Sequence, residues 1–556
     1  MQLLILDTSQ IQTYIFGSNR LRENIGASYL VAQAAGEWAL KQMPQPNNIL
    51  NAGTRELDGT KQIDEQDGLK AEVIYAGGGN VVALFADEEE AVKYTQAYSR
   101  HLLKNAPGLQ AVFWHEPFAW NGDTSLHQAV QDGFRHLAQK KQKRTYSSPL
   151  LGLGVTEMCR STAFPAVGQS NHETEPYPVS HEVQQKEKFY KKANERLTQY
   201  LPIPERYAYP RDFDDLGRSE AEQSYIAVVH ADGDGMGQRF RQVGANAPSD
   251  RAYIQAVSEF STAVGKAAQA ALRDTVQELV NKLPQYGGDK IWHSSDFNDL
   301  LAEVVLQEAK EARGVYYLPF RPLVFGGDDV TFVCDGRLGL SLALAYMRHF
   351  ETHTASLPDG RQAATASAGV AIVKSHYPFA RAYGLAEELA KRAKKYKREV
   401  GATAAALDWH FARSGLSGDI EVIREREYTV PAGQLTLRPV IVGENPLHRQ
   451  RTWPIIEQGV AIFQDVHPEK DKPAQANWST RRNKLKALRG ALREGETAVA
   501  QFRTKFLRGE PLPLVGQDAG MANWPDTGWQ LNYCGYFDAI EMMDWYIPLT
   551  SQGGEK

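Results

Sequence analysis

The sequence predicts an α+β protein made of a duplicated unit followed by a helical C-terminal region. The order strand, helix, glycine-turn hairpin, helix, strand occurs twice, at about 3–114 and again at about 225–373. After about residue 413 the apolar residues change to the spacing of amphipathic helices. A repeated order of elements indicates duplication of one unit, and 556 residues are enough for several domains.

The first copy begins with the apolar run 3–6, which predicts a strand ending at Asp7. Helical spacing follows over 10–39, and the Pro-, Asn- and Gly-rich stretch 40–70 predicts a loop. Two apolar runs, 71–75 and 81–85, flank the turn Gly77-Gly78-Gly79-Asn80 and predict a β-hairpin. A helix is expected at 88–104 and a strand at 110–114.

The second copy begins with the apolar strand 225–230, followed shortly by Asp232. A long helix is expected at 250–282, and a second hairpin has its turn at Gly326-Gly327-Asp328-Asp329. Further elements are the helix 338–350, the strand 364–373 and the helix 383–397. The expected division is therefore a first domain at 1–120, a partly helical connector at 121–221, a second domain at 222–412 and a mainly helical domain at 413–556.

Composition excludes several classes of protein. Lys and Arg total 62 against 67 Asp and Glu, so the chain has no overall basic excess of the kind that indicates a nucleic-acid-binding protein. Any contact with nucleic acid would therefore be local. Neither a secretory signal nor an apolar run of the ~20 residues that a spanning helix needs is found, so we expect a cytoplasmic protein without membrane contact. The three cysteines form no CxxC pair, and no zinc is expected.

Four carboxylates follow the strand and hairpin of the second copy, namely Asp232, Asp234, Asp328 and Asp329. Carboxylates at the ends of adjacent strands repel one another unless a cation neutralises them. Hard oxygen ligands of this kind suit two Mg²⁺ or Mn²⁺ ions bound jointly with substrate phosphates. The alternative is an ordinary hairpin turn, since Asp and Gly favour turns; a second acidic group after an apolar strand favours the metal site.

Residues 226–237 and 322–334 resemble the palm domains of GGDEF-type nucleotide cyclases and of the CRISPR polymerase family, the GGDD-containing large subunit of type III CRISPR effector complexes. The segments Ile11–Phe16, Leu21–Ser28, 367–372 and 386–394 are also similar to the latter family. The resemblance implies two ferredoxin-like palm domains in a pseudo-dimer, of a form without the family's HD nuclease domain and cysteine zinc knuckle. It also implies Asp232, Asp328 and Asp329 as catalytic metal ligands, with Gly233, Asp234, Gly326 and Gly327 against the nucleotide.

The first copy departs from this pattern, because Gly79 and Asn80 stand where the second copy has Asp328 and Asp329. Asp7 alone cannot hold two divalent ions, so we expect no chemistry in this half. It is either a structural relic or a partner that holds a second nucleotide, and Gly77, Gly78 and Ser28 are the residues expected to line that pocket.

Two clusters of basic residues have alternative interpretations. Six cations lie between Lys391 and Arg398 at the end of a predicted helix, where they form a solvated face or hold a triphosphate, with Lys395 and Lys391 the expected contacts. A second cluster, from Arg481 to Arg493, is a surface helix or a contact for RNA or a neighbouring subunit.

The function expected from this resemblance is a Mg²⁺-dependent nucleotidyltransferase that converts ATP to cyclic or linear oligoadenylate messengers in CRISPR antiviral defence. Guide or target RNA and other effector subunits are possible partners. One alternative is a diguanylate-cyclase-like enzyme that uses GTP, and another is a non-catalytic scaffold subunit of an RNA-guided complex.

Overall fold

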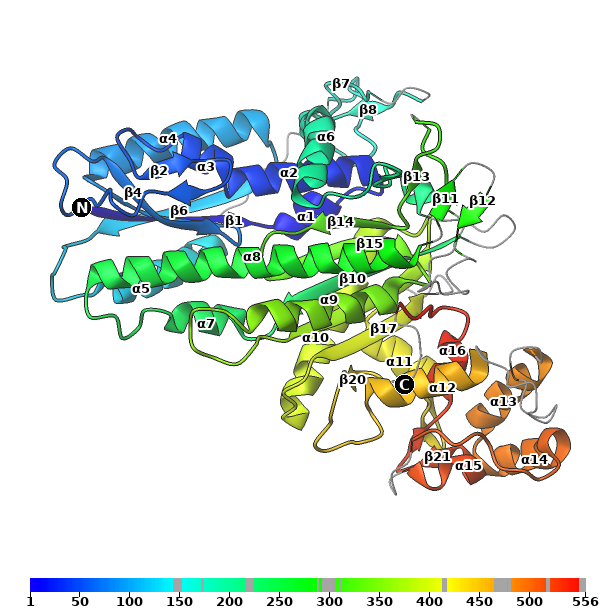
Figure 1. Cartoon of the computed structure of the whole chain (residues 1–556). Helices are drawn as coiled ribbons and strands as arrows, with labels where there is room; N and C mark the ends of the chain where they lie inside the picture. The colour runs from blue at the N-terminus through cyan, green and yellow to red at the C-terminus, as the bar shows by residue number, and fades with distance from the viewer. Residues whose placement is uncertain are drawn as a thin grey trace.

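The computed structural model describes residues 1–143, 153–171, 175–216, 224–283, 285–287, 290–292, 304, 306–310, 312–412, 418–464, 478, 482–516 and 521–549. Figure 1 shows the N-terminal sheet, the second sheet beside it and the C-terminal helices as successive parts of one molecule. Within the described residues, no helix is both long and apolar enough to cross a membrane.

The first sheet has the strand order β4-β5-β1-β6, with β1 antiparallel to both of its neighbours. Leu3 and Ile5 face one hydrophobic core while Leu4 and Leu6 face another, because helices cover both faces of β1. This explains why the run 3–6 is apolar throughout instead of alternating. The strands are β1 (Gln2–Ser9), β4 (Ala71–Gly77), β5 (Asn80–Phe85) and β6 (Gln110–Pro117). The helices are α1 (Ile11–Phe16), α2 (Leu21–Ala34), α3 (Glu37–Lys41), α4 (Glu88–Asn105) and α5 (Leu126–Lys143).

The second sheet repeats this order as β14-β15-β10-β16 and then continues with β17 and β20. Its strands are β10 (Tyr225–Gly233), β14 (Phe320–Val324), β15 (Asp329–Asp335), β16 (Ala366–Lys374), β17 (Ala406–Ala412) and β20 (Val440–Ile441). The registers correspond as well: Asp7 of β1 lies opposite Asn80, and Asp232 of β10 lies opposite Asp329. The helices are α7 (Met236–Gln242), α8 (Asp250–Lys282), α9 (Gly339–Thr354) and α10 (Phe379–Val400).

The two sheets share one hydrophobic core. Ile226 and Val228 of β10 belong to the same buried cluster as Leu4 and Leu6 of β1. The long helix α8, which packs on α9, also contacts β4 of the first sheet, and Figure 1 shows it running alongside both sheets. A stacked pair of rings, Phe16 of α1 and Tyr383 of α10, lies across the same boundary. One face of each sheet therefore packs into a shared core, while Ala227 and Val229 on the other face of β10 belong to a separate cluster without residues of the first unit.

The segment between the two units packs on α2 through α6 (His181–Tyr200). The two helices approach closely because Gly26 has no side chain: a Cβ there would overlap the backbone carbonyl of Lys186. The short elements of this region and of the other connections are β2 (Ile49–Asn51), β3 (Glu56–Leu57), β7 (Gly168–Gln169), β8 (Pro178–Val179), β9 (Tyr207–Ala208), the 3₁₀ turn Phe213–Asp215, β11 (Gln285–Gly287), β12 (Lys290–Trp292) and β13 (Tyr316–Tyr317).

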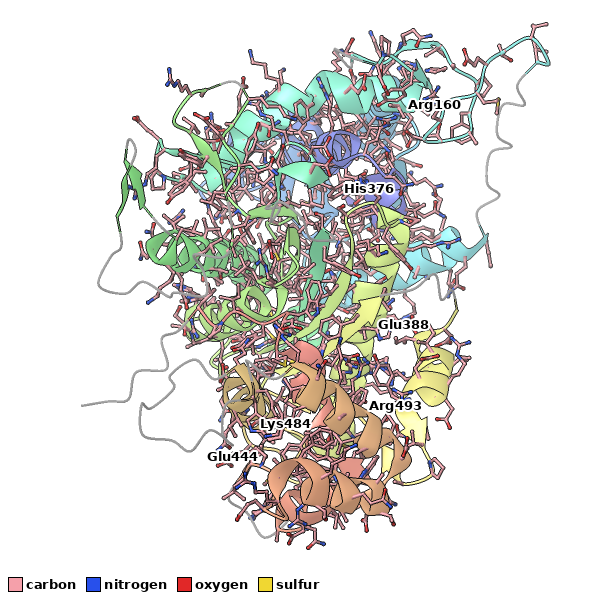
Figure 2. The ribbon with its side chains drawn as sticks, turned by 90° about the vertical axis from the view of Figure 1, so that its right-hand side faces the viewer. Arg160, His376, Glu388, Glu444, Lys484 and Arg493 are labelled. Carbon is pink, nitrogen blue, oxygen red and sulfur yellow. The ribbon has the colours of Figure 1, made fainter. Side chains whose placement is uncertain are left out.

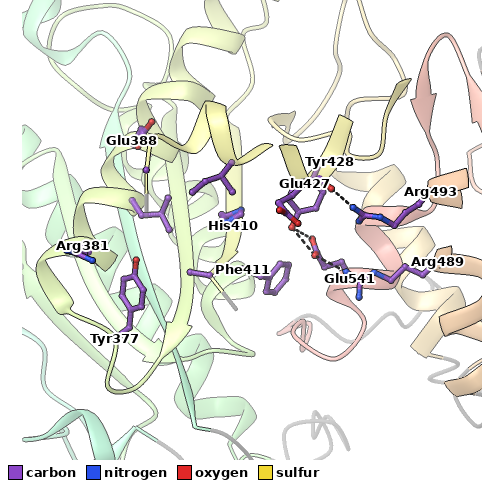
Figure 3. Close-up of a pocket in the computed structure, with 14 residues that line it drawn as sticks. Tyr377, Arg381, Glu388, His410, Phe411, Glu427, Tyr428, Arg489, Arg493 and Glu541 are labelled. Atoms are coloured by element: carbon purple, nitrogen blue, oxygen red, sulfur yellow. Dashed lines mark hydrogen bonds and ion pairs between the residues drawn. The ribbon is translucent and has the colours of Figure 1, made fainter. Parts of the chain in front are cut away.

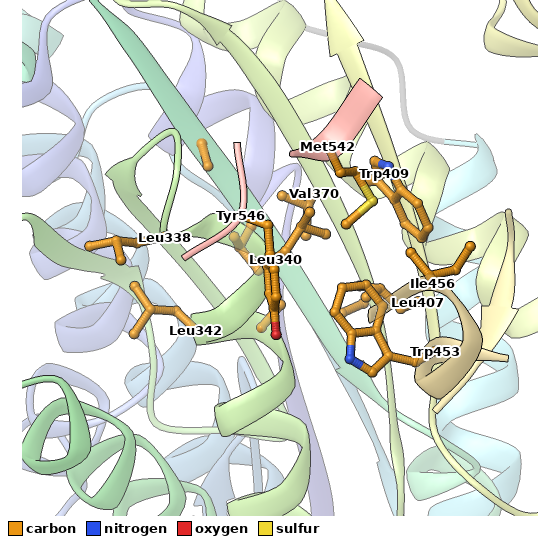
Figure 4. Packing of buried hydrophobic residues seen from close by; sticks show 14 of the residues in the cluster. Leu338, Leu340, Leu342, Val370, Leu407, Trp409, Trp453, Ile456, Met542 and Tyr546 are labelled. Carbon is orange, nitrogen blue, oxygen red and sulfur yellow. The ribbon is translucent and has the colours of Figure 1, made fainter. Parts of the chain in front are cut away.

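The C-terminal region packs on the second sheet through large apolar side chains. Trp453 contacts Trp409 of β17 and Tyr546 edge-on, and Figure 4 shows these rings beside Leu407 and Leu340. Beneath them, buried Arg438 forms ion pairs with Asp538 at 3.3 Å and Glu541 at 2.6 Å. The helices are α11 (Ile420–Tyr428), α12 (Trp453–Gln464), α13 (Arg482–Glu494), α14 (Glu496–Leu507), α15 (Trp524–Thr527) and α16 (Phe537–Met542), and β18 (Thr429–Val430), β19 (Gly433–Gln434), β21 (Trp529–Gln530) and β22 (Tyr533–Cys534) form a small sheet.

The elements differ from the sequence expectation in several places, one of which is the stretch 40–70, expected as a loop, where β2 and β3 form. The helix expected at 10–39 is three helices, and the first ends at Gly17, where a Cβ would meet the carbonyl oxygen of Thr13 at 2.7 Å. In the C-terminal region, expected to be mainly helical, α13 and α14 are divided at Gly495, which has φ of +100°. Helix α5, expected as part of a connector from residue 121, packs against β1 and β6 and so lies with the first sheet.

Candidate active site

Three carboxylates meet where β10 ends beside the β14–β15 hairpin. Asp232 ends the apolar part of β10, and its register partner Asp329 begins β15, with Asp328 one residue earlier in the turn. One carboxylate oxygen from each of the three lies within 4.8 Å of the others. The Oδ1 atom of Asp329 is buried and has no hydrogen-bond partner. The sheet register thus brings together the three residues expected as metal ligands.

The negative charges of this cluster are only partly compensated. Burial raises the pKa of the Asp328 carboxyl, and the charge of Asp232 raises it further. The pKa of Asp329 lies well above its ordinary value, chiefly through burial and then through the charge of Asp328. Burial also acts to raise the pKa of Asp232, but hydrogen bonds from Asp329 and Lys394 outweigh it, so that this pKa is lowered. A divalent cation would remove the repulsion and satisfy the buried oxygen, so the donor set fits Mg²⁺ or Mn²⁺.

Two lysines of α10 reach this end of the sheet. Lys394 Nζ donates to a carboxylate oxygen of Asp232 and, at 3.2 Å, to the carbonyl oxygen of Gly233. Lys397 Nζ donates to Asp234 at 2.7 Å. Sequence reasoning placed both in the basic cluster but did not single them out, because the face of α10 that packs on the sheet was not known.

Lys391 and Lys395, expected to contact a triphosphate, lie on another face of α10. Their side chains are 70% and 69% exposed, and their ammonium groups pair with Glu387 at 2.7 Å and Glu399 at 3.9 Å. Positions 391 and 395 share a helix face as expected, but positions 394 and 397 are on the face turned to the carboxylates. The lysines that reach the carboxylates are thus Lys394 and Lys397, and a triphosphate contact by Lys391 or Lys395 stays a prediction.

Asp234 does not belong to the metal-binding geometry found among the described residues. Its carboxylate accepts hydrogen bonds from Ser367 at 2.8 Å, from Thr365 at 3.0 Å and from Lys397. Its backbone N–H donates to the carbonyl oxygen of Thr365 at 2.8 Å. Asp234 therefore joins β10 to β16 and α10, and any contact with a nucleotide would be made through this network.

The glycines of the site play two different roles. Gly233 is required by packing, since a Cβ there would lie 2.8 Å from Cγ of Met236 and 3.2 Å from Cβ of Asp328. Gly326 has φ of +107°, and a Cβ there would have only the Tyr200 hydroxyl nearby, at 3.9 Å. A Cβ at Gly327 would meet nothing within 4 Å. Open space therefore lies beside the hairpin turn, where a nucleotide can approach the backbone.

The corresponding place in the first unit holds one carboxylate and one lysine. Asp7 forms an ion pair with Lys141 of α5, as Asp232 does with Lys394 of α10. Asn80 occupies the register position of Asp329, and its side-chain amide donates to the carbonyl oxygen of Gly78 at 3.4 Å. The described residues form no acidic cluster here. The packing of α5 on β1 and β6 is what brings Lys141 to this contact.

Ser28 and Gly77, expected to line a second nucleotide pocket, both make packing contacts, and their contact with a nucleotide stays a prediction. The Ser28 hydroxyl donates to the backbone carbonyl of Leu323 on β14, which ties α2 to the second sheet. A Cβ at Gly77 would lie 3.3 Å from Oγ of Ser261 on α8. Gly78, by contrast, has open space around it and φ of +58°.

The basic C-terminal cluster is largely paired within its own region. Lys484 lies over the ring of Trp478, and the guanidinium of Arg493 donates to the carbonyl oxygen of Glu427. Figure 2 shows these two side chains on the helices below the second sheet, and Arg481 lies outside the described residues. Arg489 and Arg493 also line a cavity of about 480 Å³ against His410 of β17 and Tyr377, which lies in the turn between β16 and α10 (Figure 3). It lies apart from the three carboxylates.

Comparison with known proteins identifies the domain that carries this geometry. Residues 225–402, which include the three carboxylates and Lys394, match the family model described as Cas10/Cmr2, second palm domain. This part of the chain is therefore similar to a Cas10/Cmr2 second palm domain. The resemblance to the CRISPR polymerase family is thereby confirmed for the second palm.

Comparison of whole chains gives more distant likenesses. No curated protein matches the sequence. A Csm1-Csm4 cassette in complex with AMPPNP is 12% identical with a TM-score of 0.49, and one in complex with cA4 is 14% identical with a TM-score of 0.46. A Csm1-Csm4 subcomplex of the type III-A CRISPR-Csm interference complex is 13% identical with a TM-score of 0.45. Each match covers 98% of this chain and 69% of the other.

Proposed function

We propose that the chain is a nucleotidyltransferase that joins ATP molecules into linear or cyclic oligoadenylate for type III CRISPR defence. The observation that carries the proposal is the cluster of Asp232, Asp328 and Asp329, which holds a buried unpartnered oxygen beside an open glycine turn. That cluster lies in a Cas10/Cmr2 second palm domain. Such a constellation suits phosphoryl transfer better than a structural turn, where clustered carboxylates only destabilise the fold.

In this proposal the three aspartates hold two Mg²⁺ or Mn²⁺ ions, which would neutralise the phosphates and the charge that develops on them. Gly326 and Gly327 let the nucleotide lie against the backbone of the hairpin. Lys394 donates a hydrogen bond to Asp232. Once a cation is bound to that carboxylate, the ammonium group of Lys394 would donate to a phosphate oxygen of the nucleotide instead. Lys397 keeps Asp234 in place and so fixes the end of β10.

We further propose that the first unit is a second palm-like half in a pseudo-dimer. The shared strand order and the repeated Asp–Lys pair support this interpretation. Without a second and third carboxylate this half would bind substrate but perform no chemistry. Activation by target RNA and assembly with further effector subunits are part of the same proposal.

The deciding experiment follows product formation from each labelled NTP with Mg²⁺. We expect oligoadenylate from ATP, and no product from the D328A/D329A variant. The control is E88A/E89A, which removes the same number of charges from the exposed first turn of α4. A guanine-rich product would favour the diguanylate-cyclase-like alternative. A wild-type complex that makes no product with target RNA present would favour a non-catalytic scaffold.

A further inference from the structure

Two arginines lie between the glycine turns of the two units, and neither belongs to a palm sheet. Arg55, in the loop between β2 and β3, has its Nη1 atom 4.0 Å from the position of a Cβ on Gly77. Arg196, on α6, lies over the ring of Phe325 at 5.2 Å. Phe325 directly precedes the Gly326 turn and packs on Tyr200, whose hydroxyl is 3.9 Å from the position of a Cβ on Gly326.

The positive charge of this cluster is only partly matched by acid, because the charge of Glu37 acts on Arg196 without forming an ion pair with it. Among the described residues neither arginine forms an ion pair with a carboxylate, and Arg55 donates only to the backbone carbonyls of Ala76 and Ala32. Burial lowers the pKa of Arg55, and the charge of Arg196 lowers it further. Burial also lowers the pKa of Arg196. Two half-buried guanidinium groups that repel each other are costly unless an anion joins them.

The place of the cluster indicates which anion it binds. Arg196 and Tyr200 stand beside the edge strand β14, whereas Lys394 and Lys397 reach the carboxylates from α10, which packs over β10, β16 and β17. The two groups of cations therefore flank the hairpin from opposite sides. The nucleotide whose phosphates lie at the metal site would use the lysines. A second nucleotide needs phosphate partners of its own, and planar guanidinium groups suit phosphate oxygens.

We propose that Arg55 and Arg196 bind the triphosphate of the second nucleotide, the one whose 3′ hydroxyl attacks. This inference rests on the proposed function. It assigns two residues outside the acidic cluster to the attacking nucleotide, whereas the acidic cluster holds the phosphates of the nucleotide that is attacked. In the reaction the O3′–Pα bond forms, the bond from Pα to the bridging oxygen breaks, pyrophosphate leaves and the hydroxyl proton goes to solvent. The arginines position the attacking nucleotide and take no proton.

The first test needs no turnover. Binding of inorganic tripolyphosphate to the full chain is measured by calorimetry in EDTA, so that the metal site makes no contribution. We expect R196Q to weaken binding by about tenfold to 100-fold, the effect of one lost charge-assisted contact, and R196K to lie in between. K191A removes an exposed charge from the same helix and should bind as the wild type does. Equal binding by R196Q and the wild type would overturn the proposal.

The second test compares acceptors with labelled ATP as donor. The wild type should prefer ATP to adenosine as acceptor, and R196Q should lose at least tenfold of that preference while the KM for the donor is unchanged. If R196Q raises the KM for the donor and keeps the preference for ATP as acceptor, the assignment is overturned. It is also overturned if R196Q loses binding of single-stranded RNA while its binding of tripolyphosphate is intact. A wild-type chain that binds tripolyphosphate through Arg196 but makes no product would contradict the proposed function and leave the anion site standing.

Discussion

At the scale of single residues, the charges at the β10 end are arranged for a ligand and not for stability. The pKa of Asp329 is held well above its ordinary value by burial and by its neighbour Asp328, so ionising it in the folded state is unfavourable. A carboxyl group whose pKa is higher in the folded state than in the unfolded state lowers the free energy of unfolding as the pH rises. The loss begins near the unfolded-state pKa and is complete above the folded-state pKa. The residues that the site needs are thus residues that the fold alone would not favour.

Replacing both hairpin aspartates by Asn should therefore stabilise the metal-free protein. In EDTA at neutral pH we expect the melting temperature of D328N/D329N to equal or exceed that of the wild type, because a repulsion is removed. Added Mg²⁺ should raise the melting temperature of the wild type and leave the variant unchanged. Scanning calorimetry with and without Mg²⁺ measures both effects. A wild type that shows no response to Mg²⁺ or Mn²⁺ would contradict the metal site.

Adjacent lysines on α10 should differ in their effect on catalysis. Lys394 contacts Asp232, whereas the side chain of Lys395 is 69% exposed. We expect K394A to raise the KM for nucleotide by about tenfold or more, the effect of losing one charge-assisted contact. K395A should change it less than twofold. Initial rates over a range of ATP concentrations decide the matter, and the reverse ranking would show that another face of α10 binds the phosphates.

At the scale of elements, the site depends on how α10 lies on the second sheet. Gly369 of β16 permits this approach, since a Cβ there would overlap the backbone carbonyl of Ala386 on the helix. A Cβ at Gly384, within α10 itself, would meet nothing within 4 Å. Two glycines fifteen positions apart thus have opposite roles, which only their surroundings distinguish.

These two glycines give a matched pair of variants. G369A should lower the free energy of unfolding by about 1–3 kcal/mol, the usual cost of overpacking, and should also lower activity by moving Lys394. G384A should raise it by about 0.5–1 kcal/mol, because Ala is the better residue in a helix. Urea unfolding followed by circular dichroism measures both. Equal stability of the two variants would contradict the close packing of α10.

At the scale of the whole molecule, the C-terminal region holds a buried cluster of charge against the second sheet, where Arg438 donates to the carbonyl oxygen of Trp409 on β17 at 3.2 Å. Arg438 is fully buried against Asp538 and Glu541 of α16, whereas Arg482 pairs with Asp544 on the exposed surface. Removing one partner of a buried pair leaves the other charge uncompensated in a medium of low polarity. Removing an exposed pair costs little, because water replaces it.

R438M should therefore cost about 3–5 kcal/mol in the free energy of unfolding. R482M should cost less than about 1 kcal/mol. The midpoints of urea unfolding, followed by tryptophan fluorescence, compare the two variants. If R438M unfolds at the midpoint of the wild type, the buried network is not what couples the C-terminal region to the palm.

Much of this protein is determined by local sequence. Periodicity predicts α8 at the residues where it lies and places the 326–329 turn, because helices and hairpins depend on neighbouring residues. Asp232, Asp328 and Asp329 follow from the same reasoning, since strand ends and turns place side chains at one edge. The break at Gly17 was missed, because a single glycine is compatible with a continuing helix.

Only the tertiary structure decides which side of a helix meets the site. Six cations between Lys391 and Arg398 are equivalent in sequence, and the packing of α10 on the sheet selects Lys394 and Lys397. Arg55 and Arg196 stand outside every recognised motif and lie between the two units only because α2, α6 and the two sheets share one packed region. The sequence determines the elements and their chemistry through contacts near in the chain. Which distant charges face one another depends on packing angles that no local pattern encodes.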